Sequence, residues 1–190
     1  MEQTKSKGVW SALVIGLKLL LICAIIAGVV SFVYTLTHDK YEENKAATKA
    51  EAIGAIFGFT DQKPLTDVLA EEEGTVVYSV ADPETKQIIG FCVEVIEPSG
   101  YGGDMTMMVG YGADGLVCGV EIISHSETPG LGSKVEGEAF REQFEGKATV
   151  DYSTVDAISG ATYSSKAVTA GVNRATKALY EAMKGGALGE

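Results

Sequence analysis

Residues 75–97, TVVYSVADPETKQIIGFCVEVIE, decide the fold class of this chain. Two runs rich in β-branched and aromatic residues flank the polar sequence DPETKQ, and this pattern predicts a β-hairpin. Further along, MTMMVGY at 105–111 and LVCGVEII at 116–123 flank GADG and predict another pair of strands. Strands joined by short turns pair antiparallel, so the sequence predicts a mostly antiparallel sheet.

Helical patterns follow the strands. The segment SKVEGEAFREQFEGK at 133–147 predicts a short amphipathic helix through Val135, Phe140 and Phe144, and ATVDYSTV at 148–155 predicts an extended segment. Residues 164–184 predict a longer helix that two glycines end. Its apolar face comprises Val168, Val172, Ala175, Leu179 and Met183. The fold class expected is therefore α+β, with mostly antiparallel strands and flanking helices.

A long apolar segment precedes the strands. Residues 9–36 contain one charged side chain, Lys18, and residues 19–37 contain none. At about 1.5 Å per residue the uncharged stretch spans roughly 29 Å, close to the roughly 30 Å hydrocarbon core of a bilayer. The sequence therefore predicts one transmembrane helix at 9–37, with a cleaved signal peptide and a buried core helix as the alternatives.

The remaining boundaries follow from this helix. A tail at 1–8 precedes it, and a stalk helix is expected at 38–60. The stalk places Ala46, Ala50, Ile53 and Phe57 at helical spacing. A single domain is expected at 61–190, since a chain of 190 residues is too short for two domains and a membrane anchor.

Charge is segregated along the chain. The net charge is −11, but residues 1–40 contain four lysines against two acidic residues, so they carry +2 and the remainder carries −13. Basic residues before the span and acidic residues after it predict a cytoplasmic N-terminus and an extracytoplasmic domain at the cell membrane. An acidic domain repels phosphates, so nucleic-acid binding is not expected, and membrane lipid is the expected surrounding of the apolar helix.

The three cysteines give little redox or metal signal. Cys23 lies in the apolar span, and neither Cys92 nor Cys118 belongs to a C-x-x-C or zinc-spaced cluster. Two buried thiols are the favoured interpretation, and a Cys92–Cys118 disulfide requires that their strands are neighbours. No metal site is expected.

Glycine-rich segments offer several candidate sites. GYGADG at 110–115 has the spacing of a dinucleotide fingerprint, but a strand rather than a helix follows it, which predicts a hairpin turn. His125 and Glu127 lead into the loop TPGLG, which is either a plain turn or the wall of a binding site, because glycine lets a backbone approach a planar ligand. Tyr101, in the turn at 99–104, either stacks on an aromatic ligand or caps the core.

The segment DAISGATYSSK at 156–166 directly precedes the last helix. Free N–H groups and the positive end of the helix dipole make such a position favourable for a phosphate. The same hydroxyl groups are equally suited to capping the helix. Ser164 and Ser165 have no evident base and orienting acid, so nucleophilic hydrolysis is not expected and no catalytic residue is assigned.

These motifs resemble segments of a known protein family. DAISGATYS at 156–164 resembles the D-x-x-[ST]-G-A-T-x-[ST] motif of the FMN-binding domain family, in which FMN is attached through its phosphate to the threonine hydroxyl. HSETPGLGSKV at 125–135 and GYGGDMTMMVGYGADG at 100–115 resemble further family segments in the expected order. With one N-terminal span, the whole chain resembles the G subunit of Rnf-type ion-translocating electron transport complexes.

The resemblance implies FMN as the cofactor and a set of site residues. Thr162 is the implied attachment point. Around it are expected Ser159, Gly160, Ala161, Ser164, Ser165 and Lys166, and around the isoalloxazine ring are expected Glu127, Thr128, Gly130, Leu131 and Tyr101.

The resemblance also implies a function. The chain would be an electron relay in a complex that moves electrons between ferredoxin and NAD and couples this to Na⁺ or H⁺ transport. Its implied partners are the other membrane subunits and a flavin transferase. The alternatives are the C subunit of a sodium-translocating NADH:quinone reductase, which shares the motif but is usually larger, an extracytoplasmic flavin reductase, and a non-catalytic membrane assembly module.

Overall fold

The computed structural model describes residues 2–59 and 64–185. The chain divides into two units, 1–46 and 47–190, and the division falls inside helix α1 (Glu2–Phe57). In the first unit, α1 is apolar between Val14 and Leu36 apart from Lys18, and its large aliphatic side chains in this stretch are exposed. A helix that is apolar all round needs an apolar environment, and this one is long enough to cross a membrane.

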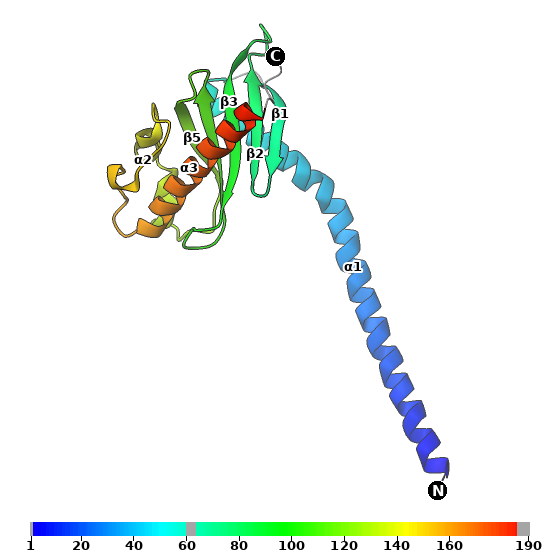
Figure 1. Ribbon diagram of the computed structural model, residues 1–190. Coiled ribbons are helices and arrows are strands. Elements are labelled where there is room, and N and C mark those ends of the chain that lie inside the picture. Colours follow the sequence, from blue (N-terminus) through cyan, green and yellow to red (C-terminus); the bar gives the residue numbers. More distant parts are fainter. Residues whose placement is uncertain (1, 60–63, 186–190) are drawn as a thin grey trace. The chain divides into compact units, whose positions relative to one another are not determined.

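In the second unit, the described residues form one antiparallel sheet of five strands in the order β1-β2-β3-β4-β5 (Figure 1). The strands are β1 (Leu65–Glu72), β2 (Thr75–Ala81), β3 (Ile88–Glu97), β4 (Met105–Gly112) and β5 (Val117–Ser124). The predicted strands β2 to β5 and the α+β class are confirmed. Strand β1 was not predicted, because most of its side chains are exposed and its sequence LTDVLAEE lacks an alternating apolar pattern.

Helix α3 (Thr162–Lys184) packs across one face of the sheet (Figure 1). The core between them consists mainly of valines and methionines from the strands and of Val168, Val172, Ala175 and Leu179 from the helix. Met183, predicted for the same face, is 42% exposed, so that prediction is wrong for the last helical turn. The start of the helix lies toward one end of the sheet and forms part of the site described below.

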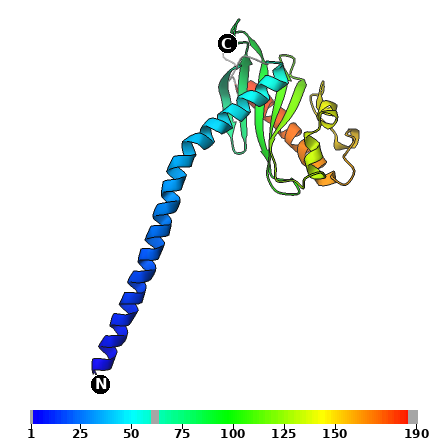
Figure 2. The same ribbon diagram turned by 180° about the vertical axis from the view of Figure 1, so that it is seen from behind.

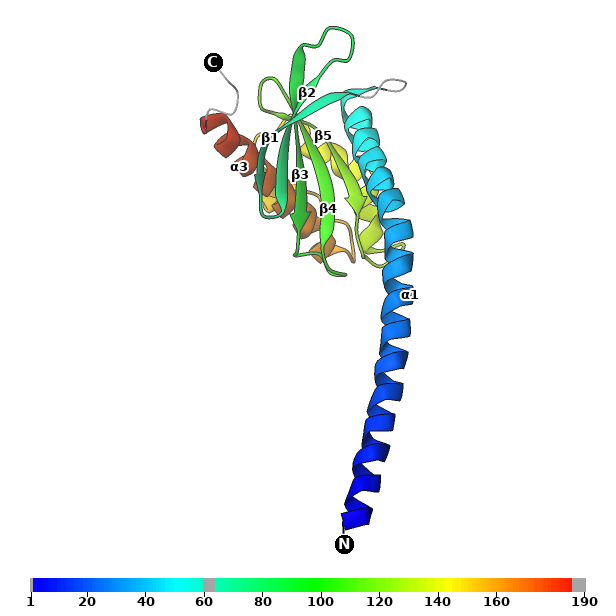
Figure 3. The ribbon, with the colours of Figure 1, turned by 90° about the vertical axis from the view of Figure 1, so that its right-hand side faces the viewer.

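The last turns of α1 cover the opposite face, so the sheet lies between two helices (Figures 2 and 3). Ile53 is buried there with Cys92 and Met108. The strands present glycines to this helix: a Cβ at Gly110 would overlap Cγ2 of Ile56, and one at Gly90 would lie 2.8 Å from Cε1 of Phe57. We call Gly90, Gly110 and Gly119 the glycine trough.

The segment between β5 and α3 differs from the prediction. In place of one amphipathic helix there are short pieces, η1 (Gly132–Glu136), α2 (Glu138–Arg141) and η2 (Glu142–Phe144). Extended Gly137 separates η1 from α2, and α2 continues directly into η2. The expected extended segment contains η3 (Tyr152–Thr154) and no strand within the described residues. The apolar positions were nevertheless predicted well, because Val135, Phe140 and Phe144 are buried.

Cys92 and Cys118 are free thiols, as favoured from the sequence, but only Cys92 is buried as expected and Cys118 is half-buried. Cys92 is on β3 and Cys118 is on β5, with β4 between them. Two inter-strand spacings amount to about 9.5 Å, beyond the roughly 7 Å that a disulfide allows between Cα atoms. The disulfide alternative is therefore excluded by the strand order.

Candidate functional site

A cavity of about 400 Å³ lies at the start of α3. It is lined by three segments that are far apart in the sequence: the turn between β3 and β4, the loop after β5, and the first turn of α3. The lining residues are Tyr101, Glu127, Thr128, Leu131, Gly132, Gly160, Ala161, Thr162, Tyr163 and Ser164. The three motifs singled out in the sequence therefore meet in one place.

The start of α3 is open toward this cavity. Its N-cap is Ala161, and no described side chain makes a cap hydrogen bond there. The sharp turn into the helix requires Gly160, whose φ is +78°. Since the first N–H groups of a helix have no intrahelical acceptor, the uncapped turn leaves donors and a positive dipole end beside exposed Thr162.

The capping interpretation of the nearby hydroxyl groups is wrong. Ser164 Oγ donates to Glu127 Oε2 at 2.7 Å, which is a contact across the cavity wall. Ser165 Oγ donates to the carbonyl of Ala161 at 3.0 Å and accepts from the N–H of Ile158 at 3.1 Å. The hydroxyls thus fix the loop that enters the helix, and leave the helix terminus itself unoccupied by a side chain.

Glu127 is buried at the wall of the cavity. Its Oε1 accepts from the N–H of Gly102 at 3.2 Å, so the carboxylate joins the β3–β4 turn to the α3 start. Glycines leave room for it: a Cβ at Gly132 would lie 2.5 Å from Glu127 Oε2, and one at Gly100 would lie 2.8 Å from Oε1. This close packing explains why glycines occur in both motifs.

The rim of the cavity is aromatic and exposed. Tyr101 and Tyr163 are 72% and 67% exposed, and their ring centroids lie 6.2 Å apart. Leu131, on the opposite loop, is 43% exposed. Tyr163 was not predicted as a site residue, and its place beside Thr162 in the motif was the only sequence signal for it. Exposed large apolar side chains around one opening are typical of a binding site.

Four predicted residues do not line the cavity. Ser159 and Gly130 are at the surface, and Ser165 is buried behind the helix start. The Nζ atom of Lys166 lies 5.1 Å from the ring centroid of Tyr152. His125, the other residue of the loop motif, supports the loop from behind. Its Nδ1 accepts from the N–H of Glu127 at 3.1 Å, and its Nε2 lies 2.9 Å from Glu136 Oε1.

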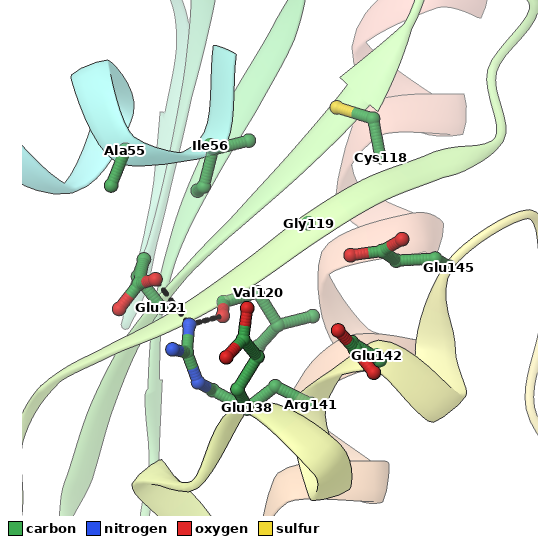
Figure 4. A pocket seen from close by; sticks show the side chains of 10 residues that line it. All are labelled: Ala55, Ile56, Cys118, Gly119, Val120, Glu121, Glu138, Arg141, Glu142 and Glu145. Atoms are coloured by element: carbon green, nitrogen blue, oxygen red, sulfur yellow. Dashed lines mark hydrogen bonds and ion pairs between the residues drawn. The ribbon is translucent and has the colours of Figure 1, made fainter. Parts of the chain in front are cut away.

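A second cavity, of about 160 Å³, lies between β5, α2 and the end of α1 (Figure 4). Among the described residues, four glutamates line it, namely Glu121, Glu138, Glu142 and Glu145. Arg141 also lines it and donates to Glu121 and to the carbonyl of Val120. In the part of the chain that the structure describes, no three histidine, cysteine, aspartate or glutamate side chains are arranged so that they could hold a metal ion. Such an acidic cavity repels a phosphate, so it does not suit FMN.

The first cavity does suit FMN. Its volume lies in the range of about 300–1,000 Å³ typical of cofactor sites. The uncapped helix start offers N–H donors to a phosphate, the exposed hydroxyl of Thr162 stands at the same place, and the aromatic rim matches a planar ring system. The donors and the rim therefore fit the two ends of one phosphate-bearing aromatic cofactor.

Comparisons with known proteins agree with this geometry. Residues 100–177 match the FMN-binding domain family, and this range contains every residue of the cavity. The chain is 31% identical to the G subunit of the ion-translocating oxidoreductase complex of Methanosarcina acetivorans, over 79% of this chain and 85% of that protein.

Other relatives carry similar names. The chain is 29% identical to the G subunit of the Na⁺-translocating ferredoxin:NAD⁺ oxidoreductase complex of Acetobacterium woodii, over 84% of this chain and 87% of that protein. It is 41% identical, over 43% of this chain and 49% of that protein, to the G subunit of the proton-translocating ferredoxin:NAD⁺ oxidoreductase complex of Clostridium ljungdahlii. The chain thus belongs to the family of G subunits of ion-translocating oxidoreductase complexes, with an FMN-binding domain built around the cavity at the start of α3.

Proposed function

We propose that this protein is a membrane-anchored electron-relay flavoprotein whose FMN is attached through its phosphate to Oγ1 of Thr162. The observation that carries the proposal is the placement of Thr162: its exposed side chain stands at an uncapped helix start inside the cavity that fits FMN. The sequence motif around Thr162, which lies inside the range that matches the FMN-binding domain family, also supports it.

The residues of the cavity have distinct tasks in this proposal. The first N–H groups of α3 stabilise the phosphate, and the positive end of the helix dipole offsets its charge. Leu131, Tyr101 and Tyr163 contact the ring at the rim, while Thr128 offers a polar contact. When bound, FMN supplies the one- and two-electron chemistry, so the protein contributes position and electrostatics.

Attachment requires an activated FMN donor. An ester forms when Thr162 Oγ1 bonds to phosphorus, loses its proton and displaces a leaving group from that phosphorus. Among the described residues, no hydrogen bond joins the Thr162 hydroxyl to a basic side chain, whereas the neighbouring hydroxyls of Ser164 and Ser165 are both engaged. We therefore assign the attachment to a separate flavin transferase, to which the exposed side chain of Thr162 is accessible.

The relay works within a complex of membrane subunits. The relatives' names assign them to ferredoxin:NAD⁺ oxidoreductase complexes, of which one translocates Na⁺ and another protons. By the same assignment this chain passes electrons between neighbouring subunits, anchored by α1 in the lipid. The basic tail and the acidic residues after the span favour a cytoplasmic N-terminus, a single membrane crossing and an extracytoplasmic domain.

Rapid-mixing reduction of the flavin tests the relay. NADH is mixed with the full chain purified alone in detergent and, separately, with the intact membrane complex, and absorbance is followed at the flavin band. The purified chain should stay oxidised, because hydride transfer needs a nicotinamide held at about 3–3.5 Å from the ring. In the complex the same flavin should be reduced. Rapid reduction of the purified chain would instead favour a self-contained flavin reductase.

A further inference from the structure

Glu127 differs from the other buried glutamates among the described residues. Glu94 and Glu97 are also buried, but Glu94 lies 2.5 Å from Lys49 Nζ and Glu97 lies 3.6 Å from Arg174 Nε. Glu127 is 5% exposed, and in residues 2–59 and 64–185 no lysine, arginine or histidine forms an ion pair with it. Its contacts are neutral donors.

Keeping an unpaired carboxylate in this position is costly. Burying a charge without a counter-charge is unfavourable, and neutral hydrogen bonds offset only part of that cost. The fold nevertheless accommodates it, with Ser164 and the N–H of Gly102 as donors and with Gly100 and Gly132 making room.

We propose that the negative charge of Glu127, which no cationic side chain of the described residues pairs with, biases the bound flavin toward its oxidised form. The inference rests on the proposed function. Reduction of a flavin by two electrons and one proton leaves it one unit more negative, and a fixed negative charge lining the same cavity opposes that change. Because Glu127 is buried, solvent and salt screen this repulsion weakly. The charge therefore lowers the potential at which the relay accepts electrons.

Glu127→Gln isolates the charge from the contacts. The amide has the size of the carboxylate, its oxygen still accepts from Gly102, and its nitrogen donates to Ser164 Oγ. Flavin loading is first measured by fluorescence in a denaturing gel, and the flavin is then titrated with redox mediators in the full chain at fixed pH. In the flavin-loaded fraction we expect a shift of the two-electron equilibrium of about tenfold toward the reduced form, or about 30 mV. An unchanged potential would overturn the proposal.

Two further variants keep the test independent of how Glu127→Gln folds. Glu127→Asp keeps the charge, and Ser164→Ala keeps it while removing one hydrogen-bond donor to the carboxylate. The account predicts a potential within about twofold of wild type for the first and an equal or lower potential for the second. A reduction potential that rises in both variants as much as expected for Glu127→Gln would show that altered packing causes the shift. That result would contradict an effect of the charge.

A measurement without flavin gives a second readout. In the Thr162→Ala background, Glu127→Gln should leave the unfolding temperature unchanged or raise it, because a buried unpaired charge is removed. A clear fall in the unfolding temperature would mean that the carboxylate stabilises the folded domain, which would contradict the proposal. Failure of the proposed function is distinct: it would appear as absent flavin in the wild type, or as flavin that Thr162→Ala retains.

Discussion

At the level of single residues, the domain's thiols are held in an unreactive form. Burial raises the pKa of Cys92 far above its ordinary value. Burial raises the pKa of Cys118 to about 11, and the nearby carboxylates of Glu145 and Asp114 add to the effect. Both thiols therefore stay protonated near neutral pH.

The pH dependence of alkylation tests this at Cys118. In a Cys23→Ser variant, iodoacetamide should modify the folded protein about ten- to hundredfold more slowly at pH 8 than an unfolded thiol, since a pKa two units higher leaves little thiolate. The rate should rise with pH until about 11. A rate that levels off near pH 9 would contradict the raised pKa. Cys92 should react only after unfolding.

The sign of the linked stability change follows from the same shift. Between the ordinary thiol pKa and about 11, the folded protein keeps a proton at Cys118 that the unfolded chain has lost. Where the native state binds more protons than the unfolded state, the free energy of unfolding falls as pH rises. Cys118 therefore lowers the free energy of unfolding as pH rises through this range. Below the ordinary pKa both states are protonated, and the group contributes no pH dependence.

At the level of elements, the glycine trough fixes how the end of α1 packs on the sheet. A methyl group at Gly110 would overlap Ile56, so Gly110→Ala should lower the free energy of unfolding by about 1–3 kcal/mol. Denaturant unfolding of the full chain in detergent, followed by near-UV circular dichroism, measures this. The matched control is the cycle with Ile56→Ala: the double variant should lose less than the two single losses combined. Additive losses would show that helix and trough do not meet.

The elements also show which sequence signals predict structure. Strands β2 to β5 and helix α3 were predicted because each buries a face or a core position, which leaves an apolar pattern. Strand β1 is paired on one side and largely exposed, so its residues carry no such pattern. Between β5 and α3, Val135 and Phe140 indicated which positions are buried but not how the backbone folds. Extended Gly137 interrupts the segment and Gly146, with φ +70°, follows its last turn, so the pieces are too short to propagate a helix.

The site, too, was predicted only in part from the sequence. Composition and spacing placed the motifs at turns, and the family resemblance indicated which of them hold FMN. Neither indicated that Glu127 bonds to Ser164 and Gly102, because those contacts depend on how strands and helix pack. Tyr163 and Lys166 both lie close to Thr162 in sequence, but Tyr163 is at the cavity rim and Lys166 lies over the ring of Tyr152. The two side chains leave the helix in different directions, which depends on how the helix is oriented about its axis.

At the level of the whole molecule, the charge asymmetry predicts a direction of insertion. Ala113→Cys places a thiol in the exposed turn between β4 and β5, and Ser6→Cys places one in the basic tail. A membrane-impermeant maleimide applied to intact cells, with any outer membrane opened, should label the first and spare the second. Permeabilised cells serve as the control, in which both are labelled. Labelling of the tail alone in intact cells would reverse the proposed orientation.

The most direct test of the account is the mass of the peptide that contains Thr162, from protein purified out of its native membrane complex. The account predicts a mass increase equal to one FMN less one water, with fragment ions that place it on Thr162. Thr162→Ala should abolish the increase and the in-gel flavin fluorescence while leaving the fold intact, because the side chain is exposed. An unmodified Thr162 in a complex that carries flavin, or flavin that remains covalently bound to the alanine variant, would contradict it.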